Sequence, residues 1–356
     1  PPPGYYMRGL TLTVYDGKGW QNPPTVERAT HAADQPWTEP PQRGRKLLTQ
    51  SVFLDFNTQL LYAAPEPLES GADYRTEARG DGDLIAMWAR ERSYNVVSTV
   101  PAVNEEMLDA VGSWNDEQPL PPAYAVHLEL PPTITERTRT LAADLTDGQE
   151  TQFQKAQAIE AFLRGYEYDL SVPEPPAAVE DVADFFLFDL QRGYCDYYAT
   201  AFIVLARLAG LPARFATGFA VGQWDYPTGL WVVTEAEAHS WPEVYFPEYG
   251  WIPFEPTAGR TELTRIGIPE FNSSGAPLRP APRRRSKRMG LRGIGRCCFG
   301  WRRWRWFFGE AIDWLSIDGS GARIRGRGFC VGGEVLGDRW TPAKRCWSMA
   351  MDWPTL

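Results

Sequence analysis

Three residue types that can cooperate in covalent catalysis occur in the order cysteine, histidine, glutamate within residues 195–255. Cys195 stands in "RGYCDYYATAF", His239 in "AHSWPEVYF" and Glu255 in "WIPFEPT". A thiolate can attack a carbonyl carbon, an imidazole can carry the proton, and a carboxylate can hold the imidazole in orientation. We therefore expect a nucleophile, a general base and an orienting acid for acyl transfer.

Cys195 lies at the start of a predicted helix. Gly193 and Tyr194 form a turn before it, and "AGLP" ends the apolar run. The residues with helical spacing are Ala199, Phe202, Ile203, Ala206 and Ala209. The first turn of a helix presents unpaired N–H groups and a partial positive charge, which favour a thiolate over a thiol.

His239 begins a strand-like run in which alternate side chains point to opposite faces. Its face also carries Trp241, Glu243 and Tyr245. Glu255, in the next run, shares this face only if the turn through "PEYG" closes with an odd number of residues or contains a bulge. An even turn without a bulge would place the carboxylate on the wrong side.

Each of these residues also fits an ordinary structural role. A single cysteine beside an apolar run is usually a small buried hydrophobe, and Glu255 is compatible with a solvated carboxylate at a strand end. His31 and His127 lie in the N-terminal β region and in the segment that follows it, where a solvated or core role is the default interpretation. His239 is therefore the histidine expected to act as the base.

The elements around these residues divide the chain. Residues 1–100 alternate apolar and polar side chains in short runs, with hairpin-type Asp-Gly pairs at 16–17 and 81–82, and predict an antiparallel β domain. Residues 101–149 form a Pro-rich connector that leads into a helix beginning near Thr133 or Thr135.

Residues 150–259 supply the remaining elements. An amphipathic helix stops at Gly165 and carries Phe153, Ala156, Ile159 and Phe162 on one face. A shorter helix in "VEDVADFFLFDL", the helix after Cys195 and four strand-like runs follow. Helices followed by an antiparallel sheet indicate an α+β fold rather than a wound parallel sheet.

Composition excludes several classes of function for the first 270 residues. They carry 39 Asp and Glu against 19 Lys and Arg, which argues against a nucleic-acid-binding surface. Cys195 is their only cysteine, so it forms no disulfide within them. Three scattered histidines without a cysteine pair give no ligand spacing, so we expect no metal and no cofactor.

Residues 260–356 differ in kind from the rest. Residues 271–356 carry 17 Lys and Arg against 6 Asp and Glu, and residues 301–353 hold seven of the fifteen tryptophans. The sequence fits a basic membrane-surface segment, but it shows neither a hydrophobic face nor the polar bias of natural disorder. We expect this tail to be unstructured or to result from a reading-frame error.

Two segments together resemble a known family. "GYCDYYATAFIVLARLAGLPARFATGFAVG" and "EAHSWPEVYFPEYGWIPFEPT" are similar to the core of the transglutaminase-like superfamily, which has a papain-like fold and a Cys-His-Asp triad. The similarity covers roughly residues 150–259 and is strongest to the bacterial membrane-anchored branch. "YYMRGLTLTVYDGKGW" also resembles the β segment that precedes the catalytic domain in that branch.

The resemblance implies a role for each site residue. Cys195 is the nucleophile, His239 the base and Glu255 the orienting acid, with Glu in place of the usual Asp. We expect the backbone N–H of Cys195 to stabilise the oxyanion, with Tyr194 and Trp241 as further oxyanion or substrate-binding residues.

The implied reaction is acyl transfer from a glutamine carboxamide or a peptide bond through a thioester, with an amine or water as acceptor. The partner is then a protein or peptide substrate. A non-catalytic cell-surface binding module on the same scaffold is the alternative. The family also implies anchoring at the extracytoplasmic face of the bacterial membrane. No run reaches about 18 apolar residues, and the chain begins at Pro1 without a leader, so any targeting segment is expected upstream.

Overall fold

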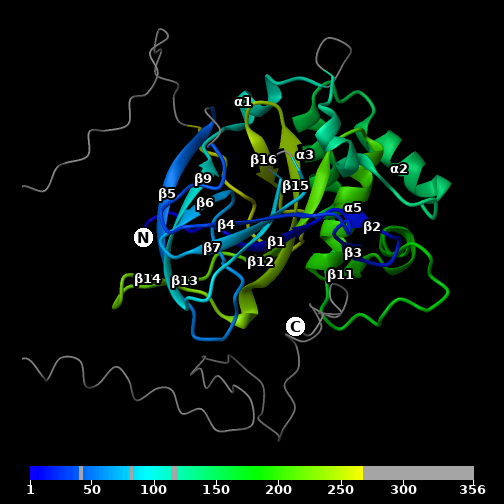
Figure 1. Cartoon of the computed structure of the whole chain (residues 1–356). Coiled ribbons are helices and arrows are strands. Elements are labelled where there is room, and N and C mark those ends of the chain that lie inside the picture. Colours follow the sequence, from blue (N-terminus) through cyan, green and yellow to red (C-terminus); the bar gives the residue numbers. More distant parts are fainter. Residues whose placement is uncertain (40–42, 81–82, 114–118, 268–356) are drawn as a thin grey trace, which may run out of the picture. The chain divides into compact units, whose positions relative to one another are not determined.

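A seven-stranded antiparallel sheet is the central element of the protein. The computed structural model describes residues 1–39, 43–80, 83–113 and 119–267 (Figure 1). The strand order is β16 (Gly250–Pro253), β15 (Ala238–Phe246), β12 (Ala213–Phe219), β1 (Met7–Leu12), β8 (Leu84–Trp88), β7 (Tyr74–Ala78) and β4 (Glu27–His31). The predicted turn at 81–82 and the tail from residue 268 onward lie outside these ranges.

The other strands form smaller sheets. A three-stranded sheet has the order β5 (Arg45–Phe53), β9 (Ser93–Pro101) and β6 (Pro67–Ser70). The two-stranded sheets are β2 (Val14–Tyr15) with β3 (Trp20–Gln21), β10 (Glu167–Tyr168) with β11 (Arg192–Gly193), and β13 (Gln223–Asp225) with β14 (Leu230–Val232). Gly17, in the β2–β3 turn, has a φ of 97°, as the Asp-Gly pair predicted.

The helices gather on one side of the sheet (Figure 1). The helical elements are α1 (Glu105–Asp109), η1 (Pro122–Leu128), α2 (Glu136–Thr146), α3 (Gln152–Leu163), α4 (Val182–Asp184), η2 (Phe185–Leu190), α5 (Cys195–Leu208) and η3 (Glu235–Glu237). None of the helices in the described ranges is long and apolar enough to cross a membrane.

Local signals explain where the main helices begin. The Thr135 hydroxyl accepts a hydrogen bond from Thr138 N at the start of α2, and Thr151 does the same for Gln154 N at the start of α3. The predicted helix starts near Thr135 and after residue 150 are thus confirmed. Helix α5 is buried from its first residue to Arg207, and it packs against β12 and β15. Most side chains of α5 are apolar, which favours a position inside the core.

Strands from distant parts of the sequence share the main sheet. Strand β1 lies between β8 and β12. The N-terminal strands and the strands from residue 213 onward in the main sheet therefore form one hydrogen-bonded sheet. The mixed helix and antiparallel-sheet architecture confirms the predicted α+β class. The domain boundaries at residues 100 and 150 remain a prediction about how the chain is organised.

One of the four predicted strand-like runs does not join the main sheet. The run "GLWVVTE" contributes β14, which pairs only with β13 among the described strands. Tyr226, at the tip of this hairpin, is 77 % exposed, and Leu230 and Val232 are also exposed. The sequence predicts a strand here correctly, but the pattern of residue types does not indicate which strand it pairs with.

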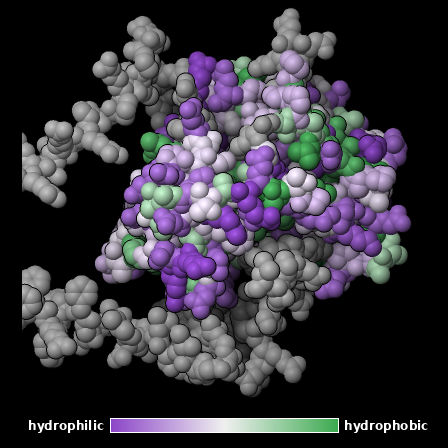
Figure 2. All heavy atoms as spheres, in the orientation of Figure 1, coloured by the Kyte–Doolittle hydropathy of each residue, from purple (hydrophilic) through white to green (hydrophobic). Residues whose placement is uncertain are grey.

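On the face shown in Figure 2, hydrophobic residues are scattered among hydrophilic ones.

Candidate active site

Cys195 is the first residue of α5 and is held there by close backbone packing. Tyr194 is the residue before the helix, in an extended conformation. A side chain at Gly193 would come within 2.9 Å of the Tyr197 ring, so only glycine allows this approach. Cys195 is 2 % exposed and belongs to no disulfide. The thiol therefore lies in the first turn of the helix, near the positive end of the helix dipole.

Strands β15 and β16 bring His239 and Glu255 together. Phe246 pairs with Gly250, so the turn contains three residues, the odd number that the predicted arrangement requires. Gly250 has a φ of 73°, which closes this turn. The pairing continues past β16, because Phe254 N donates to Pro242 O at 3.0 Å. His239 Nε2 then lies 2.6 Å from Glu255 Oε2, and both side chains are buried.

The charges of this pair support each other. Burial opposes a charged imidazole, but Glu255 and Cys195 outweigh it and raise the pKa of His239 to about 9. Burial likewise opposes ionisation of Glu255, yet the His239 charge and its hydrogen bond keep the pKa of Glu255 below its ordinary value. Glu255 occupies Nε2, so Nδ1 is the nitrogen that remains for Cys195. At neutral pH the imidazole is therefore protonated beside the thiol.

Glu255 is fixed by further donors. Thr257 N donates to Oε1 at 3.0 Å, and the Tyr6 hydroxyl donates to Oε2 at 2.5 Å. Its own backbone N–H donates to the Glu160 carboxylate at 2.6 Å, and Arg164 donates to its carbonyl oxygen at 2.7 Å. A carboxylate held in this way has little freedom to rotate, so it fixes the plane of the imidazole.

Two residues predicted to line the site lie beside it. Trp241 is fully buried, and its ring stacks near His239, with 6.1 Å between ring centroids and 22° between planes. Its indole N–H donates to Glu243 at 3.3 Å. The N–H therefore points to Glu243, and the face of the indole ring lies toward His239. Tyr194 is buried and meets the Tyr197 ring edge-on at 5.1 Å. Their oxyanion or substrate-binding roles stay predictions.

A second carboxylate lies next to the thiol. The Cys195 thiol is 3.8 Å from Asp196 Oδ1, and the Ser240 hydroxyl donates to the same oxygen at 2.6 Å. Burial raises the pKa of Asp196 to about 6, although the Ser240 hydrogen bond and the His239 charge act in the opposite direction. Asp196 is thus a second acceptor close to the thiol, but its pKa is lower than that of His239, so the proton is held by the imidazole.

Sequence reasoning missed Tyr6, Asp196 and Ser240. Asp196 follows Cys195 directly and Ser240 follows His239 directly. This adjacency is the one sequence signal that indicates a place in the site. Period-two alternation places Ser240 on the face opposite His239, so the pattern does not predict a place for Ser240 in the site. Tyr6 is 249 positions from Glu255, and no local pattern announces the contact.

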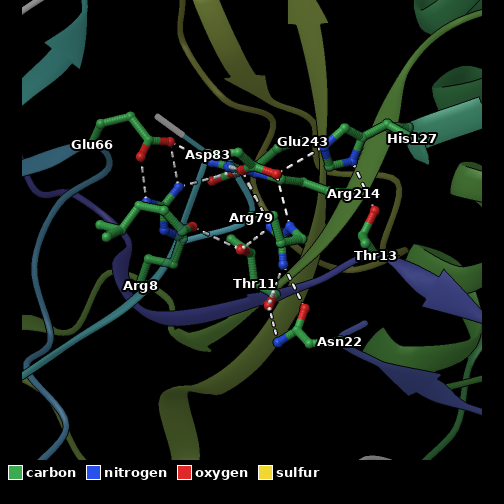
Figure 3. Close-up of polar contacts among 12 residues, drawn as sticks. Arg8, Thr11, Thr13, Asn22, Glu66, Arg79, Asp83, His127, Arg214 and Glu243 are labelled. Carbon is green, nitrogen blue, oxygen red and sulfur yellow. Dashed lines mark hydrogen bonds and ion pairs between the residues drawn. The ribbon is translucent and has the colours of Figure 1, made fainter. Parts of the chain in front are cut away.

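A buried ion cluster is shown in Figure 3. It adjoins the site through Glu243, which accepts a hydrogen bond from the Trp241 indole. Arg214 contacts Glu243 at 2.6 Å and also pairs with Glu66 and Asp83. The remaining members complete the charge balance: Arg8 contacts Glu66 at 2.6 Å and Glu243 at 2.9 Å, and Arg79 contacts Asp83 at 2.8 Å. Three guanidinium groups therefore face three carboxylates.

His127 belongs to this cluster as a neutral member. Burial lowers its pKa to about 4, although Asp83 opposes the shift. Its Nε2 lies 2.8 Å from Asp83, and its Nδ1 lies 2.8 Å from the Thr13 hydroxyl. His31 contacts the Thr76 hydroxyl at 2.9 Å. His127 and His31 therefore both make polar contacts away from Cys195, in agreement with the structural roles that the sequence predicts for them.

The fold and the geometry of the site agree with the comparison to known proteins. Residues 139–256 match the transglutaminase-like superfamily, and residues 1–104 match the TgpA N-terminal domain. Residues 139–256 thus carry a transglutaminase-like core. The family resemblance seen in the sequence is confirmed.

Particular relatives are similar over different lengths. The uncharacterized protein YebA of Bacillus subtilis is 38% identical over 156 residues, which are 42% of this chain and 21% of that protein. The protein-glutamine gamma-glutamyltransferase of Pseudomonas aeruginosa is 28% identical over 258 residues, 71% of this chain and 35% of that protein. The chain thus spans only about a fifth and a third of these relatives.

A solved structure shares the architecture. The periplasmic domain of TgpA from Pseudomonas aeruginosa bound to ethylmercury superposes with a TM-score of 0.53 at 25% identity, covering 72% of this chain and 85% of that chain. The shared region, 72% of this chain, is longer than the transglutaminase-like core of residues 139–256.

Proposed function

We propose that this protein is a cysteine-dependent acyltransferase that acts on glutamine carboxamides of proteins or peptides. The observation that carries the proposal is the buried contact of 2.6 Å between His239 and Glu255, with Cys195 beside the imidazole at the start of α5. The name of the Pseudomonas aeruginosa relative supports the choice of a glutamine side chain as acyl donor.

The proposed reaction begins from a thiolate and an imidazolium. The Cys195 sulfur attacks the carboxamide carbon, and the oxyanion forms near the backbone N–H of Cys195. His239 gives its proton to the departing nitrogen, so ammonia leaves and a thioester remains. An acceptor amine, or water, then loses a proton to His239 and attacks the thioester, which returns the sulfur as a thiolate. Glu255 holds the imidazole throughout.

The acceptor decides the outcome of the reaction. An amine gives a cross-link with an isopeptide bond, whereas water gives deamidation, or proteolysis if the acyl donor is a peptide bond. We propose the amine route, because the relative's name describes glutamyl transfer. Hydrolysis of a peptide bond uses the same residues and is the second outcome that an assay must separate.

A glutamine-containing peptide and a fluorescent primary amine provide the test. Incorporation of the amine with release of ammonia supports transfer, ammonia release alone indicates deamidation, and new peptide termini indicate proteolysis. Cys195→Ala should abolish each signal. A wild-type protein that gives none of the three while it binds partners would favour the non-catalytic binding module.

We also propose that the domain works outside the cytoplasm. The support is the periplasmic origin of the similar TgpA domain. Protease treatment of intact spheroplasts provides the measurement: the domain should be cleaved from outside, and protection until the cells are lysed would contradict the proposal.

A further inference from the structure

Tyr6 reaches into the site from the N-terminal region. Its hydroxyl lies 2.5 Å from Glu255 Oε2, the same oxygen that contacts His239 Nε2. Its ring meets the His239 ring edge-on, at 5.5 Å and 90°, and meets Trp241 at 5.0 Å and 68°. Tyr6 is thus in contact with the base, the acid and the aromatic residue beside them.

The hydroxyl can act only as a donor to this carboxylate. Burial, followed by the charge of Glu255 and its hydrogen bond, raises the pKa of Tyr6 far above its ordinary range. The phenol therefore keeps its proton, and an O–H donated to a carboxylate is a strong hydrogen bond. It fixes Oε2 in place and takes up part of the negative charge that would otherwise act on His239.

The strand that follows Tyr6 cannot shift easily. Strand β1 pairs Arg8 with Gly218, and Gly218 pairs on its other side with His239. A side chain at Gly218 would come within 2.0 Å of the Met7 carbonyl oxygen, so the two backbones are as close as they can be. Arg8 is also bound to Glu66 and Glu243 in the ion cluster. These contacts give Tyr6 a fixed position relative to His239.

From these contacts we propose that Tyr6 is a positioning residue of the triad, supplied by the N-terminal β region, which thereby completes the catalytic centre. The proposal rests on the function proposed above. It gives the N-terminal strands a part in the reaction itself, acting through Glu255 on the orientation and the proton affinity of His239.

Tyr6→Phe tests the proposal because it removes the hydroxyl and keeps the ring. We expect kcat to fall about 10-fold to 100-fold, the range for one hydrogen bond to a charged group, with KM little changed. Glu255 then acts more strongly on His239, so the alkaline limb of the pH–rate profile should move to higher pH. Tyr5→Phe is the matched control, since the Tyr5 ring packs near Lys46, at 5.8 Å from its ammonium.

A double variant separates positioning from general packing. If Tyr6 acts through Glu255, Tyr6→Phe should have little further effect in a Glu255→Gln background, because coupled residues are not additive. A loss of equal size in both backgrounds, or a Tyr6→Phe variant that matches the wild type in kcat and pH profile, would overturn the proposal.

A readout without turnover keeps this result apart from the proposed function. The rate of Cys195 alkylation by iodoacetamide, measured against pH, reports the thiol and His239 even when no acyl substrate is turned over. A Tyr6→Phe profile displaced from that of the wild type supports the positioning role in that case as well. Superimposable profiles would refute it, whatever the reaction.

Discussion

Glu255 joins three donors on one carboxylate: His239, Tyr6 and the backbone N–H of Thr257. The family that the sequence resembles usually has aspartate at this position, and the orienting acid predicted here is a glutamate. The extra methylene of glutamate is accommodated here, since the carboxylate still reaches Nε2 at 2.6 Å. Its negative charge is the leading influence that raises the pKa of His239, so the proton affinity of the base depends on this residue.

Glu255→Gln should therefore lower the pKa of His239 from about 9 toward its ordinary value of 6.5. Because the folded-state pKa is raised, the stabilisation from this charge is complete below about pH 6.5 and is lost as the pH rises through about 9. The stability of Glu255→Gln should therefore not fall in this way between pH 6.5 and about pH 9. An NMR titration of the His239 ring, with denaturant unfolding at several pH values, measures both effects.

Glu237→Gln serves as the control, because its carboxylate is only half-buried and caps η3 by accepting from Thr234 N. An unchanged His239 titration in Glu255→Gln would contradict the assigned role of the carboxylate.

The hairpin of β15 and β16 and the β1–β12 pair set the geometry of the triad. The sequence stated the condition on the turn, because side-chain alternation is a local property, but it left the turn length open, and the three-residue turn meets the condition. The starts of α2 and α3 were likewise readable from Thr135 and Thr151. The β1–β12 pairing was not, since strand partners 200 residues apart leave no local periodicity, and Tyr6 was missed for the same reason.

Gly218→Ala tests the close approach of β1 and β12. The added methyl would meet the Met7 carbonyl oxygen at 2.0 Å, so one strand must move. We expect a loss of about 1–3 kcal/mol in the free energy of unfolding, typical of overpacking, together with a fall in activity as Tyr6 leaves Glu255. Thermal and denaturant unfolding and the amine-transfer assay measure these changes.

The control for this substitution is Gly71→Ala. The nearest atom to an added methyl there is Asn95 Cβ at 3.4 Å, an ordinary contact. If the Gly218→Ala protein had the stability and activity of the Gly71→Ala protein, the close contact between β1 and β12 at Gly218 would be contradicted.

The ion cluster connects the N-terminal strands with the strands of the transglutaminase-like core. Its charged members come from β1, β12 and β15 and from the segments around Glu66, Arg79 and Asp83, so the charges of the N-terminal region balance those of the transglutaminase-like core. Glu66 is central: burial opposes its ionisation, but Arg214 and Arg8 outweigh this and lower its pKa to about 2. Removing one member leaves the others buried without full compensation.

Glu66→Gln should cost about 3–5 kcal/mol at pH 7, the range for breaking a buried pair. Since the folded-state pKa is depressed, the contribution of Glu66 is present above about pH 4.5 and is lost as the pH falls through about 2. The difference between wild type and variant should thus shrink across this interval, which denaturant unfolding at several pH values measures.

Glu77→Gln is the matched control. The Glu77 side chain has the same exposure as that of Glu66, 17%, but its partner Arg28 is 60% exposed. Exposed pairs contribute about 0–1 kcal/mol. Equal losses in Glu66→Gln and Glu77→Gln would contradict the importance given to the cluster.

The alkylation rate of Cys195 by iodoacetamide against pH, in the full chain and in His239→Ala, is the most direct test of an activated Cys195–His239 pair. Mass spectrometry of the peptide 193–207 separates Cys195 from the other cysteines. We predict that the wild-type rate persists well below pH 8.5, the ordinary pKa of a thiol, and that His239→Ala restores an ordinary thiol profile. An ordinary profile in the wild type, unchanged by His239→Ala, would contradict an activated Cys195–His239 pair.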